Sequence, residues 1–583
     1  MRFPALALLC LIACLDEARA ARIEIPLRLS LETLREALGS QVRLAYREGR
    51  CRYLKVEPLR VEAAQGRLRV SGPGRGALGV EAAGMCQTAA AWQGSLQFTL
   101  APRIDGAGHL RLRILDSRLT GVPPVLWDFG KPHLHRRLER FSYDFGASRE
   151  ALAALVRSAA PPMHAAAMEQ ALQSLEIGEP RVEAAQVVIP LALELPDAWL
   201  APPPAASSAA LLTEAELEAL EKALEPLDAF LVYIVRHVAR GDQDAELRQR
   251  LFTLLLESRY QLVGMLAGDL AAAGDPLRAL FLETWSELRA ILLETKRYAL
   301  FVDASDVLAA LEAAAPGLPL SAEGLRQLAR SLNPAESADP LAYEWSVDRE
   351  LGELFGVEEM RETQPAPLPT KSWLDFLIPR AYAETPIDRW VPKHGELVAY
   401  QVHVGGLLRK TSAAELGRAK LAAPYAEIYR HLVPTTALIE SCWRQYVVRG
   451  GKVTYLRSQS SSVGIMQINQ RVWRGFYDIQ RVRWDTAYNI RAGAQILLRY
   501  MKDYAIPYAE KAGEPDFAPR AAYAVYNAGP RAVGRFAKSP PHPREARVDE
   551  KLWALYRGIA GGAPVDLASC GVKPGRSSAS PEQ

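Results

Sequence analysis

Three kinds of feature are scarce in this 583-residue sequence. After the first twenty residues, no apolar run approaches the roughly 20 residues that a membrane-spanning helix needs, and the longest, residues 230–235, is bounded by charged side chains. The net charge is only +3, whereas a dedicated nucleic-acid-binding protein carries a concentrated basic excess, so we expect no nucleic-acid partner. No Cys/His spacing matches a metal site, and we expect neither a metal nor a cofactor.

Acidic residues are missing from one stretch near the C-terminal end. Residues 441–477 contain no Asp or Glu but six Lys or Arg residues, and this stretch directly follows Glu440. We predict a helix that begins at Pro434 and ends at Gly450-Gly451, with Glu440 beside an apolar stripe. Burial there would raise the pKa of the carboxyl, as a general acid near neutral pH requires. A solvated surface glutamate is the alternative interpretation.

Residues 1–20 are typical of an export signal. A basic residue precedes an apolar run, and Ala18-Arg19-Ala20 forms a small-x-small cleavage pattern. Lipoprotein processing at Cys14 is the alternative, because the residues before it resemble a lipobox. Both interpretations predict an exported protein of the periplasm or cell envelope, and the second predicts an outer-membrane lipoprotein.

Export would place the protein where disulfides persist. Once the signal is removed, four cysteines remain. We expect Cys51 to pair with Cys86, because both lie in the first predicted domain, and Cys442 to pair with Cys570, which would tie the tail to the C-terminal domain. Four cysteines allow three pairings, so this expectation rests on proximity in the sequence alone.

The hydrophobic pattern predicts a multidomain α+β protein. Residues 21–200 alternate with period two between Gly and Pro clusters, which predicts a β-rich domain of mostly antiparallel strands. The opening of this domain faintly resembles the lipid-binding tubular proteins, although a generic β scaffold is the simpler interpretation. Residues 201–209, rich in Pro, Ala and Ser, predict a linker, and residues 210–358 carry helical spacing that predicts a helical middle region.

The C-terminal part follows a second linker. Residues 359–395 contain a Pro-rich run and predict that linker, whereas residues 396–561 predict a mostly α-helical domain. Residues 562–583 are rich in Gly, Ser, Ala and Pro, which predicts a disordered tail.

Four short phrases occur in order in the predicted C-terminal domain. Each would recur by chance, but together they resemble the soluble-lytic-transglycosylase (SLT) domain of the lytic transglycosylase family. The phrases are Glu440-Ser441, Gly464-Ile465-Met466-Gln467, Asn489-Ile490 followed by Gly493 and Leu497, and Tyr526-Asn527 followed by Gly529. The resemblance implies a lysozyme-like fold for residues 396–561 and leaves most of the chain outside it.

The resemblance implies a peptidoglycan lytic transglycosylase, which cleaves the β-1,4 bond between N-acetylmuramic acid and N-acetylglucosamine without consuming water. Glu440 would protonate the bridging oxygen as an acid. It would then act as a base on the muramoyl 6-hydroxyl, which closes a 1,6-anhydro ring. A substrate-assisted route of this kind departs from the usual pair of carboxyl groups, in keeping with the acid-free residues 441–477.

By the same resemblance, seven further residues bind or orient the substrate: Ser441, Gly464, Ile465, Met466, Gln467, Tyr526 and Asn527. Gly464 would permit close approach of the sugar to a loop that it forms with the two residues after it. Gln467 would hydrogen-bond the substrate, and Tyr526 would bond the catalytic carboxyl. Ser441 would orient the catalytic region, and Asn527 would contact the substrate or brace the site.

Two alternatives stay open in the sequence. A goose-type muramidase would hydrolyse the same bond, and Asp478 or Asp485 could supply a second carboxylate, although both residues suit helix caps or surface positions. A non-catalytic envelope module would only bind glycan. The expected partners are peptidoglycan strands and, through residues 21–358, an envelope protein or a lipid.

Overall fold

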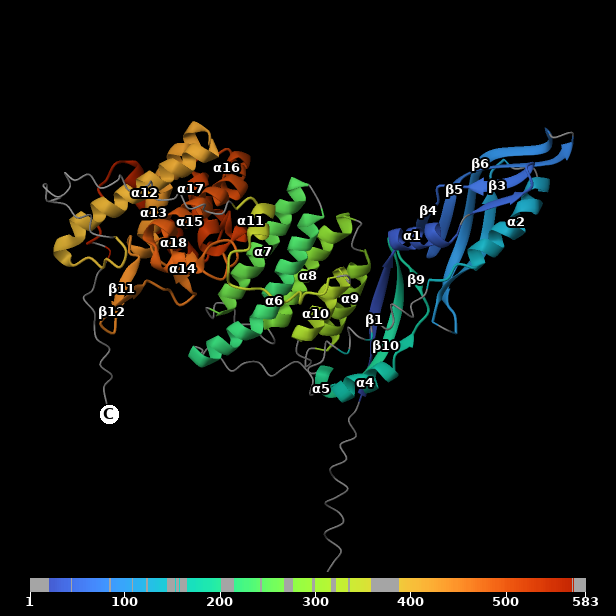
Figure 1. Ribbon diagram of the computed structural model, residues 1–583, viewed down its shortest axis with the longest axis horizontal. Coiled ribbons are helices and arrows are strands. Elements are labelled where there is room, and N and C mark those ends of the chain that lie inside the picture. The colour runs from blue at the N-terminus through green and yellow to red at the C-terminus, as the bar shows by residue number, and fades with distance from the viewer. Residues whose placement is uncertain are drawn as a thin grey trace, which may run out of the picture. The chain divides into compact units, whose positions relative to one another are not determined.

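The computed structural model describes most of the chain (Figure 1). The described residues are 20–42, 44–82, 85–106, 108–121, 124–143, 153, 157, 165–200, 214–241, 244–266, 276–295, 299–315, 321–333, 336–357, 387–568 and 570. Residues 1–19 of the expected export signal, the first linker and most of the second linker and of the tail lie outside the described residues. The described part is a mixed α+β structure, β-rich toward the N-terminus and helical toward the C-terminus, which confirms the predicted class.

The chain divides into two compact units. The first unit comprises Met1–Ala210, Lys222–Ile234 and Ala272–Ala342. The second unit comprises Leu211–Glu221, Val235–Ala271 and Tyr343–Gln583. The helices between residues 210 and 358 therefore do not all belong to one unit.

Two antiparallel sheets form the β-rich part of the first unit (Figure 1). The larger sheet has the strand order β2-β3-β5-β6-β7, with β4 paired to β5. Its strands are β2 (Ala45–Glu48), β3 (Arg52–Val56), β4 (Arg60–Ala64), β5 (Arg67–Ala82), β6 (Met85–Ile104) and β7 (Leu110–Leu119). The smaller sheet pairs β10 (Gln186–Pro196) with β1 (Ala20–Ser30), β8 (Glu176–Ile177) and β9 (Arg181–Val182). Because side chains alternate along a strand, one face of each sheet enters a shared core that includes Leu68, Phe98 and Val187.

Helices complete the first unit. They are α1 (Leu31–Gln41), α2 (Pro124–Glu139), α4 (Ala165–Gln173), α5 (Asp197–Leu200), α8 (Pro276–Thr295), α9 (Ala299–Ala314) and α10 (Ala322–Leu332). Helix α2 buries Leu126, Leu134 and Leu138 in the core of the sheets. Helix α6 (Glu214–Arg240) contributes residues to both units.

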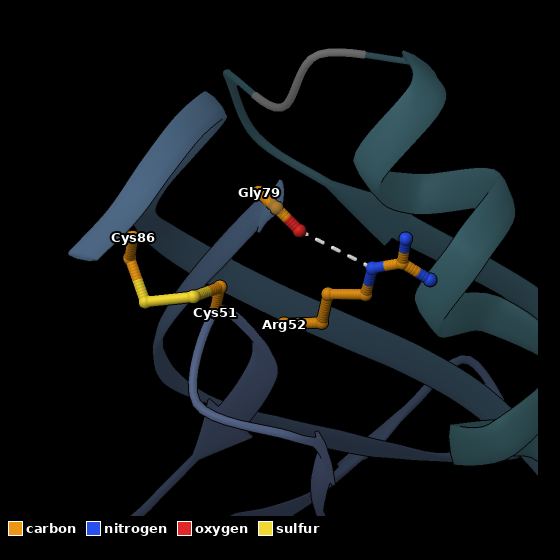
Figure 2. The surroundings of a disulfide bond; sticks show 4 residues. All are labelled: Cys51, Arg52, Gly79 and Cys86. Atoms are coloured by element: carbon orange, nitrogen blue, oxygen red, sulfur yellow. Dashed lines mark hydrogen bonds between the residues drawn. A yellow bond between two sulfur atoms is a disulfide. The ribbon is translucent and has the colours of Figure 1, made fainter. Parts of the chain in front are cut away.

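Cys51 and Cys86 are joined by a disulfide, the pair that proximity in the sequence favours (Figure 2). Cys51 directly precedes β3, and Cys86 lies at the start of β6. Beside the bond, the Arg52 guanidinium donates to the Gly79 carbonyl at 3.2 Å (Figure 2). The disulfide and this hydrogen bond therefore attach the far ends of β5 and β6 to the start of β3.

Replacing both Cys51 and Cys86 by Ser should destabilise the first unit. The bond spans 35 residues, and a closed loop of this length restricts the unfolded chain enough to contribute about 3 to 4 kcal/mol. We expect the unfolding midpoint in urea to fall accordingly. Reductant should lower the midpoint of the wild type toward that of the variant and leave the variant unchanged; an unchanged wild-type midpoint under reducing conditions would contradict this role.

The second unit is mostly helical. Its helices are α7 (Ala245–Leu266), α11 (Arg349–Leu354), α12 (Leu397–Ala419), α13 (Ala423–Ser441), α14 (Ile479–Trp484), α15 (Thr486–Tyr500), α16 (Ile506–Ala512), α17 (Phe517–Ala528) and α18 (Pro543–Ala560). Short helical turns are η3 (His394–Glu396), η4 (Met501–Ala505), η5 (Pro530–Ala532) and η6 (Arg535–Ala537). Two small antiparallel pairs join β11 (Tyr446–Arg449) to β12 (Lys452–Tyr455) and β13 (Ser462–Val463) to β14 (Ile468–Asn469).

Helix α13 differs from the helix expected between Pro434 and Gly450. Pro434 lies inside α13, and its carbonyl accepts a hydrogen bond from the Trp443 indole at 2.9 Å. The helix ends at Ser441 because Cys442 and Trp443 both adopt the left-handed conformation, with φ of 53° and 58°. The Trp443 carbonyl also accepts from the buried Tyr400 hydroxyl at 2.7 Å. The predicted limits were wrong because these tertiary contacts, and not the glycine pair, decide where the helix stops.

Candidate active site

Glu440 lies in the last turn of α13, close to the left-handed turn that ends the helix. The Tyr523 hydroxyl, from α17, donates to Glu440 Oε1 at 2.8 Å. Burial raises the pKa of the Glu440 carboxyl to about 7, although the Tyr523 hydrogen bond and the Arg535 guanidinium oppose the rise by favouring the charged form. The carboxyl can therefore hold a proton near neutral pH and can also release it.

The sequence analysis predicted the wrong tyrosine as the hydrogen-bond donor to Glu440. We expected Tyr526 to bond the carboxyl, but its hydroxyl donates to the Met466 carbonyl at 2.6 Å. Tyr523 precedes it by three residues on the same helix, so both side chains lie on neighbouring positions of one face. Which of the two meets Glu440 depends on how α17 packs against α13.

The carboxyl of Glu440 borders a cavity of about 170 Å³. Hydroxyl and amide groups form one part of its wall: Ser458, Ser460, Ser462, Gln467, Asn469 and Asn527. Apolar and aromatic side chains form the other part: Tyr260, Val263, Ile468, Trp473, Ile496 and Tyr526. Aromatic faces beside a few placed polar groups suit a sugar ring, which has apolar faces and a polar edge. Among the described residues that line this cavity, Glu440 is the one carboxylate.

Hydrogen bonds between its backbone and buried side chains hold the loop from Gly464 to Gln467 in place. Two buried amide side chains accept from it: Gln445 Oε1 accepts from Ile465 N at 2.7 Å, and Asn489 Oδ1 accepts from Met466 N at 2.9 Å. Ser441 donates to the Ile465 carbonyl at 2.6 Å, directly beside Glu440 in the chain. The loop and the C-terminal end of α13 are thus fixed to each other.

Gly464 cannot be replaced without moving this loop. Its φ is +77°, and a Cβ atom there would lie 2.2 Å from Asn489 Nδ2 and 2.4 Å from Gln445 Oε1. The close approach that the sequence suggested for a sugar is made instead by the two amide side chains that orient the loop.

The expected substrate-binding residues fall into two groups. Gln467, Tyr526 and Asn527 line the cavity with Glu440. Ile465 and Met466 are fully buried, and Ser441 is 3% exposed, so these three lie behind the cavity wall. Their observed contacts position the loop.

Asp478 and Asp485, the alternative second carboxylates, cap helices. Asp478 accepts from the backbone of Gln480 and Arg481 at the start of α14. Asp485 accepts from Tyr488 N at the start of α15, at 2.8 Å. Neither lines the cavity with Glu440.

Cys442 and Cys570 are both free thiols, so the expected second disulfide is absent from the structure. The Cys442 sulfur lies 3.9 Å from the Cys570 backbone oxygen, so proximity was predicted correctly but not the bond. Burial, followed by the neighbouring Cys442 thiol, raises the pKa of Cys570 to about 12.

Helix α7 contributes to the cavity from outside the region that resembles an SLT domain. The Tyr260 hydroxyl donates to the Tyr526 carbonyl and lies 3.1 Å from the Tyr500 hydroxyl. Its ring packs so closely on Gly529 that a Cβ atom there would lie 2.9 Å from it. Glu257, one turn earlier, accepts from the backbone of Arg531. The sequence analysis missed this wall, because nothing in the sequence of α7 distinguishes Tyr260 from an ordinary aromatic residue of a helix.

Arg535 and Asp549 form a buried ion pair near Glu440 that the sequence analysis also missed. The two side chains are 4% and 3% exposed and approach to 2.8 Å. Arg535 also donates to Asn527 Oδ1 at 2.9 Å. The pair therefore holds Asn527 at the cavity and partly offsets the effect of burial on Glu440.

The second unit thus places one protonatable carboxyl group beside a cavity of about 170 Å³ in a mostly helical domain. Residues 422–547 match the family model of the Transglycosylase SLT domain. The C-terminal part of the chain is therefore an SLT domain of the lytic transglycosylase family, whose substrate is peptidoglycan, and the resemblance of the four phrases is confirmed. No curated protein and no solved structure matches the chain.

Two further findings concern the described residues alone. No described helix combines the length and the apolar character that a bilayer crossing requires. In the same residues, no group of three or more His, Cys, Asp and Glu side chains could hold a metal ion.

Replacing Glu440 by Gln should stabilise the fold in a pH-dependent way. The folded state favours the protonated acid, so the wild type loses stability relative to the variant as the pH rises from about 4.5 to about 7. Below this range we expect equal stability, and above it a gain of up to roughly 3 kcal/mol for Glu440→Gln, measured by urea unfolding at several pH values. Glu550→Gln, an exposed change on α18, is the matched control. The same pH-dependent gain in both variants would contradict the burial of Glu440.

Proposed function

We propose that the protein is an exported peptidoglycan lytic transglycosylase that cleaves the β-1,4 bond between N-acetylmuramic acid and N-acetylglucosamine and leaves a 1,6-anhydro end. The observation that carries this proposal is the single carboxyl group at the cavity, whose pKa is about 7. A general acid works best when its pKa lies near the working pH, because it must be protonated and still able to give up the proton.

The reaction would use Glu440 twice. The protonated carboxyl donates to the bridging oxygen as the glycosidic bond breaks, and the 2-acetamido group of the substrate stabilises the developing positive charge. The resulting carboxylate then accepts the proton of the muramoyl 6-hydroxyl while that oxygen bonds to the anomeric carbon. The acid is regenerated, and no water enters the products.

The surrounding side chains would position the sugar for these steps. Gln467 and Asn527 offer amide groups to the substrate, and Tyr260 and Tyr526 offer aromatic rings. Asn527 is held by Arg535, and the loop before Gln467 is held by Gln445 and Asn489. Supported groups of this kind lose little freedom when the substrate binds, which favours orientation of the bond beside Glu440.

Two features favour this reaction over hydrolysis by a goose-type muramidase. Asp478 and Asp485 act as helix caps, and none of the other described cavity residues carries a carboxylate that could activate water. An inverting hydrolase needs such a second group on the far side of the sugar. Localisation in the periplasm or cell envelope, by way of residues 1–20 or of lipidated Cys14, is part of the proposal.

Digestion of purified sacculi by the full-length protein tests the proposal directly. We expect soluble muropeptides with 1,6-anhydro ends, identified by mass spectrometry, and a loss of at least about 1000-fold in rate for Glu440→Gln, because the acid and the base are removed together. Reducing muramic ends would instead identify a muramidase. Glycan binding without any cleavage by the wild type would identify a non-catalytic module.

Replacing Tyr523 by Phe tests the electrostatics of the acid. The Tyr523 hydroxyl lowers the pKa of Glu440, so its removal should raise that pKa further. Activity depends on the protonated acid and should fall above pH 7 in the wild type, and we expect this alkaline limb to move to higher pH in Tyr523→Phe. Tyr526→Phe removes a hydroxyl that contacts Met466 instead, so its alkaline limb should not move. A shift of the limb in Tyr526→Phe alone would contradict the assignment.

A further inference from the structure

A second and larger cavity lies in the same unit as the candidate active site. It measures about 710 Å³, within the range of sites for small organic ligands. Its lining includes one aromatic, two uncharged polar and three basic side chains: Trp345, Ser461, Gln470, Arg457, Arg471 and Arg483. We call this cavity the arginine pocket.

Positive charge dominates the arginine pocket. Among the described residues, no carboxylate forms an ion pair with Arg457 or Arg483. Arg457 donates to the Ser461 hydroxyl at 2.9 Å, and Arg483 donates through Nε to Gln470 Oε1 at 2.6 Å. These contacts orient each guanidinium while leaving other N–H groups of the fork, which is the geometry that binds a carboxylate with two hydrogen bonds.

The carboxylate that lines this pocket already accepts hydrogen bonds from the backbone. Asp478 is the one carboxylate among the described lining residues, and it accepts from the backbone N–H groups of Gln480 and Arg481. Those bonds hold it at the start of α14. Arg457 and Arg483 therefore give the lining more positive than negative charge, and an anionic ligand would meet a net positive wall.

Trp345 gives the pocket an aromatic side. This residue lies in the segment before α11 and is 36% exposed. Arg474, itself buried, donates to the carbonyls of Tyr343 and Glu344 and lies 4.6 Å from the Trp345 ring centroid. The tryptophan is thus docked onto the SLT domain by a segment from outside the family match.

One loop and one strand pair separate the arginine pocket from the cavity of Glu440. Ser460 and Ser462 line the Glu440 cavity, whereas Ser461 between them lines the arginine pocket. Likewise Asn469 lines the first cavity and Gln470 lines the second. Ser461 has a left-handed backbone, with φ of 66°, within the turn between these residues. Neighbouring residues of the two segments therefore line different cavities, and the two cavities share these segments as a common wall.

We propose that the arginine pocket binds the carboxylates of the stem peptide that the substrate carries on N-acetylmuramic acid. This inference rests on the proposed function, because that function brings the muramoyl group to Glu440. The stem peptide is attached to the same sugar ring whose bond is cleaved. An extended peptide spans roughly 3.5 Å per residue, and residues adjacent in the chain, such as Ser460 and Ser461, line the two cavities.

The arrangement makes the protein selective for peptide-bearing glycan. Binding energy gained in the arginine pocket, away from the reacting bond, would hold the muramoyl residue in register beside Glu440. Strands stripped of peptide would lack this contact and would be cut less efficiently. Arg457 and Arg483 are therefore positioning residues for the reaction.

The selectivity test compares two substrates prepared from the same sacculi. One is intact glycan with stem peptides, and the other is the same glycan after an amidase has removed them. We expect the full-length wild type to have the higher kcat/KM on the peptide-bearing strands. The double variant Arg457→Gln and Arg483→Gln should lower the ratio of the two kcat/KM values by about 10-fold or more, mainly through KM on peptide-bearing strands, because each change removes a charge-assisted hydrogen bond.

The matched control is Arg547→Gln, which removes an exposed arginine on α18 that lines neither cavity. The ratio should stay at the wild-type value in this variant. An unchanged ratio in the double variant, or an equal fall in the control, overturns the stem-peptide site. If the wild type cleaves neither substrate, the proposed function fails.

A binding measurement keeps the two failures distinct. In the Glu440→Gln protein, isothermal titration compares a disaccharide that carries a tetrapeptide with the same disaccharide after the peptide has been removed. We expect tighter binding of the peptide-bearing form, an advantage that 0.5 M salt and the double arginine variant both reduce. Equal affinity for the two ligands overturns the inference whether or not the wild type is an active enzyme.

Discussion

The candidate active site depends on the partial burial of one carboxyl group at the end of α13. The left-handed turn at Cys442 and Trp443 stops the helix directly after Glu440, and the Trp443 indole and carbonyl are both hydrogen-bonded inside the domain. Burial then disfavours the charged carboxylate, while Tyr523 and Arg535 moderate the effect. The balance leaves the pKa near neutrality, where a single group can act as an acid and as a base.

Buried polar groups carry the precision of the site, because each must find a partner away from water. The side chains of Gln445, Asn489 and Ser441 find their partners in the backbone of the loop that leads to Gln467, and these hydrogen bonds hold the loop. The Arg535–Asp549 pair does the same for Asn527. Ser441 and Asn489, which belong to the four phrases, therefore support the cavity wall from behind.

The site extends beyond the SLT domain itself. Helix α7 supplies Tyr260 to the Glu440 cavity, and the segment before α11 supplies Trp345 to the arginine pocket. Both segments precede residues 422–547. Tyr260 donates to the Tyr526 carbonyl of the domain, whereas Arg474 of the domain donates to the Glu344 carbonyl of the segment before α11. Part of the chain ahead of the family match thus shapes the surroundings of the acid.

The sequence by itself determined the mixed α+β class, the proximity of Cys51 and Cys86, and the position of Glu440, since these follow from local periodicity, from spacing and from short phrases. It did not determine where α13 ends, which tyrosine meets the carboxyl, or that Cys442 and Cys570 stay unbonded. Only the tertiary structure decided these, because each depends on the packing of segments that are distant in the chain. The same holds for Tyr260 in α7, whose neighbours in sequence contain no sign of a cavity more than 170 residues further on.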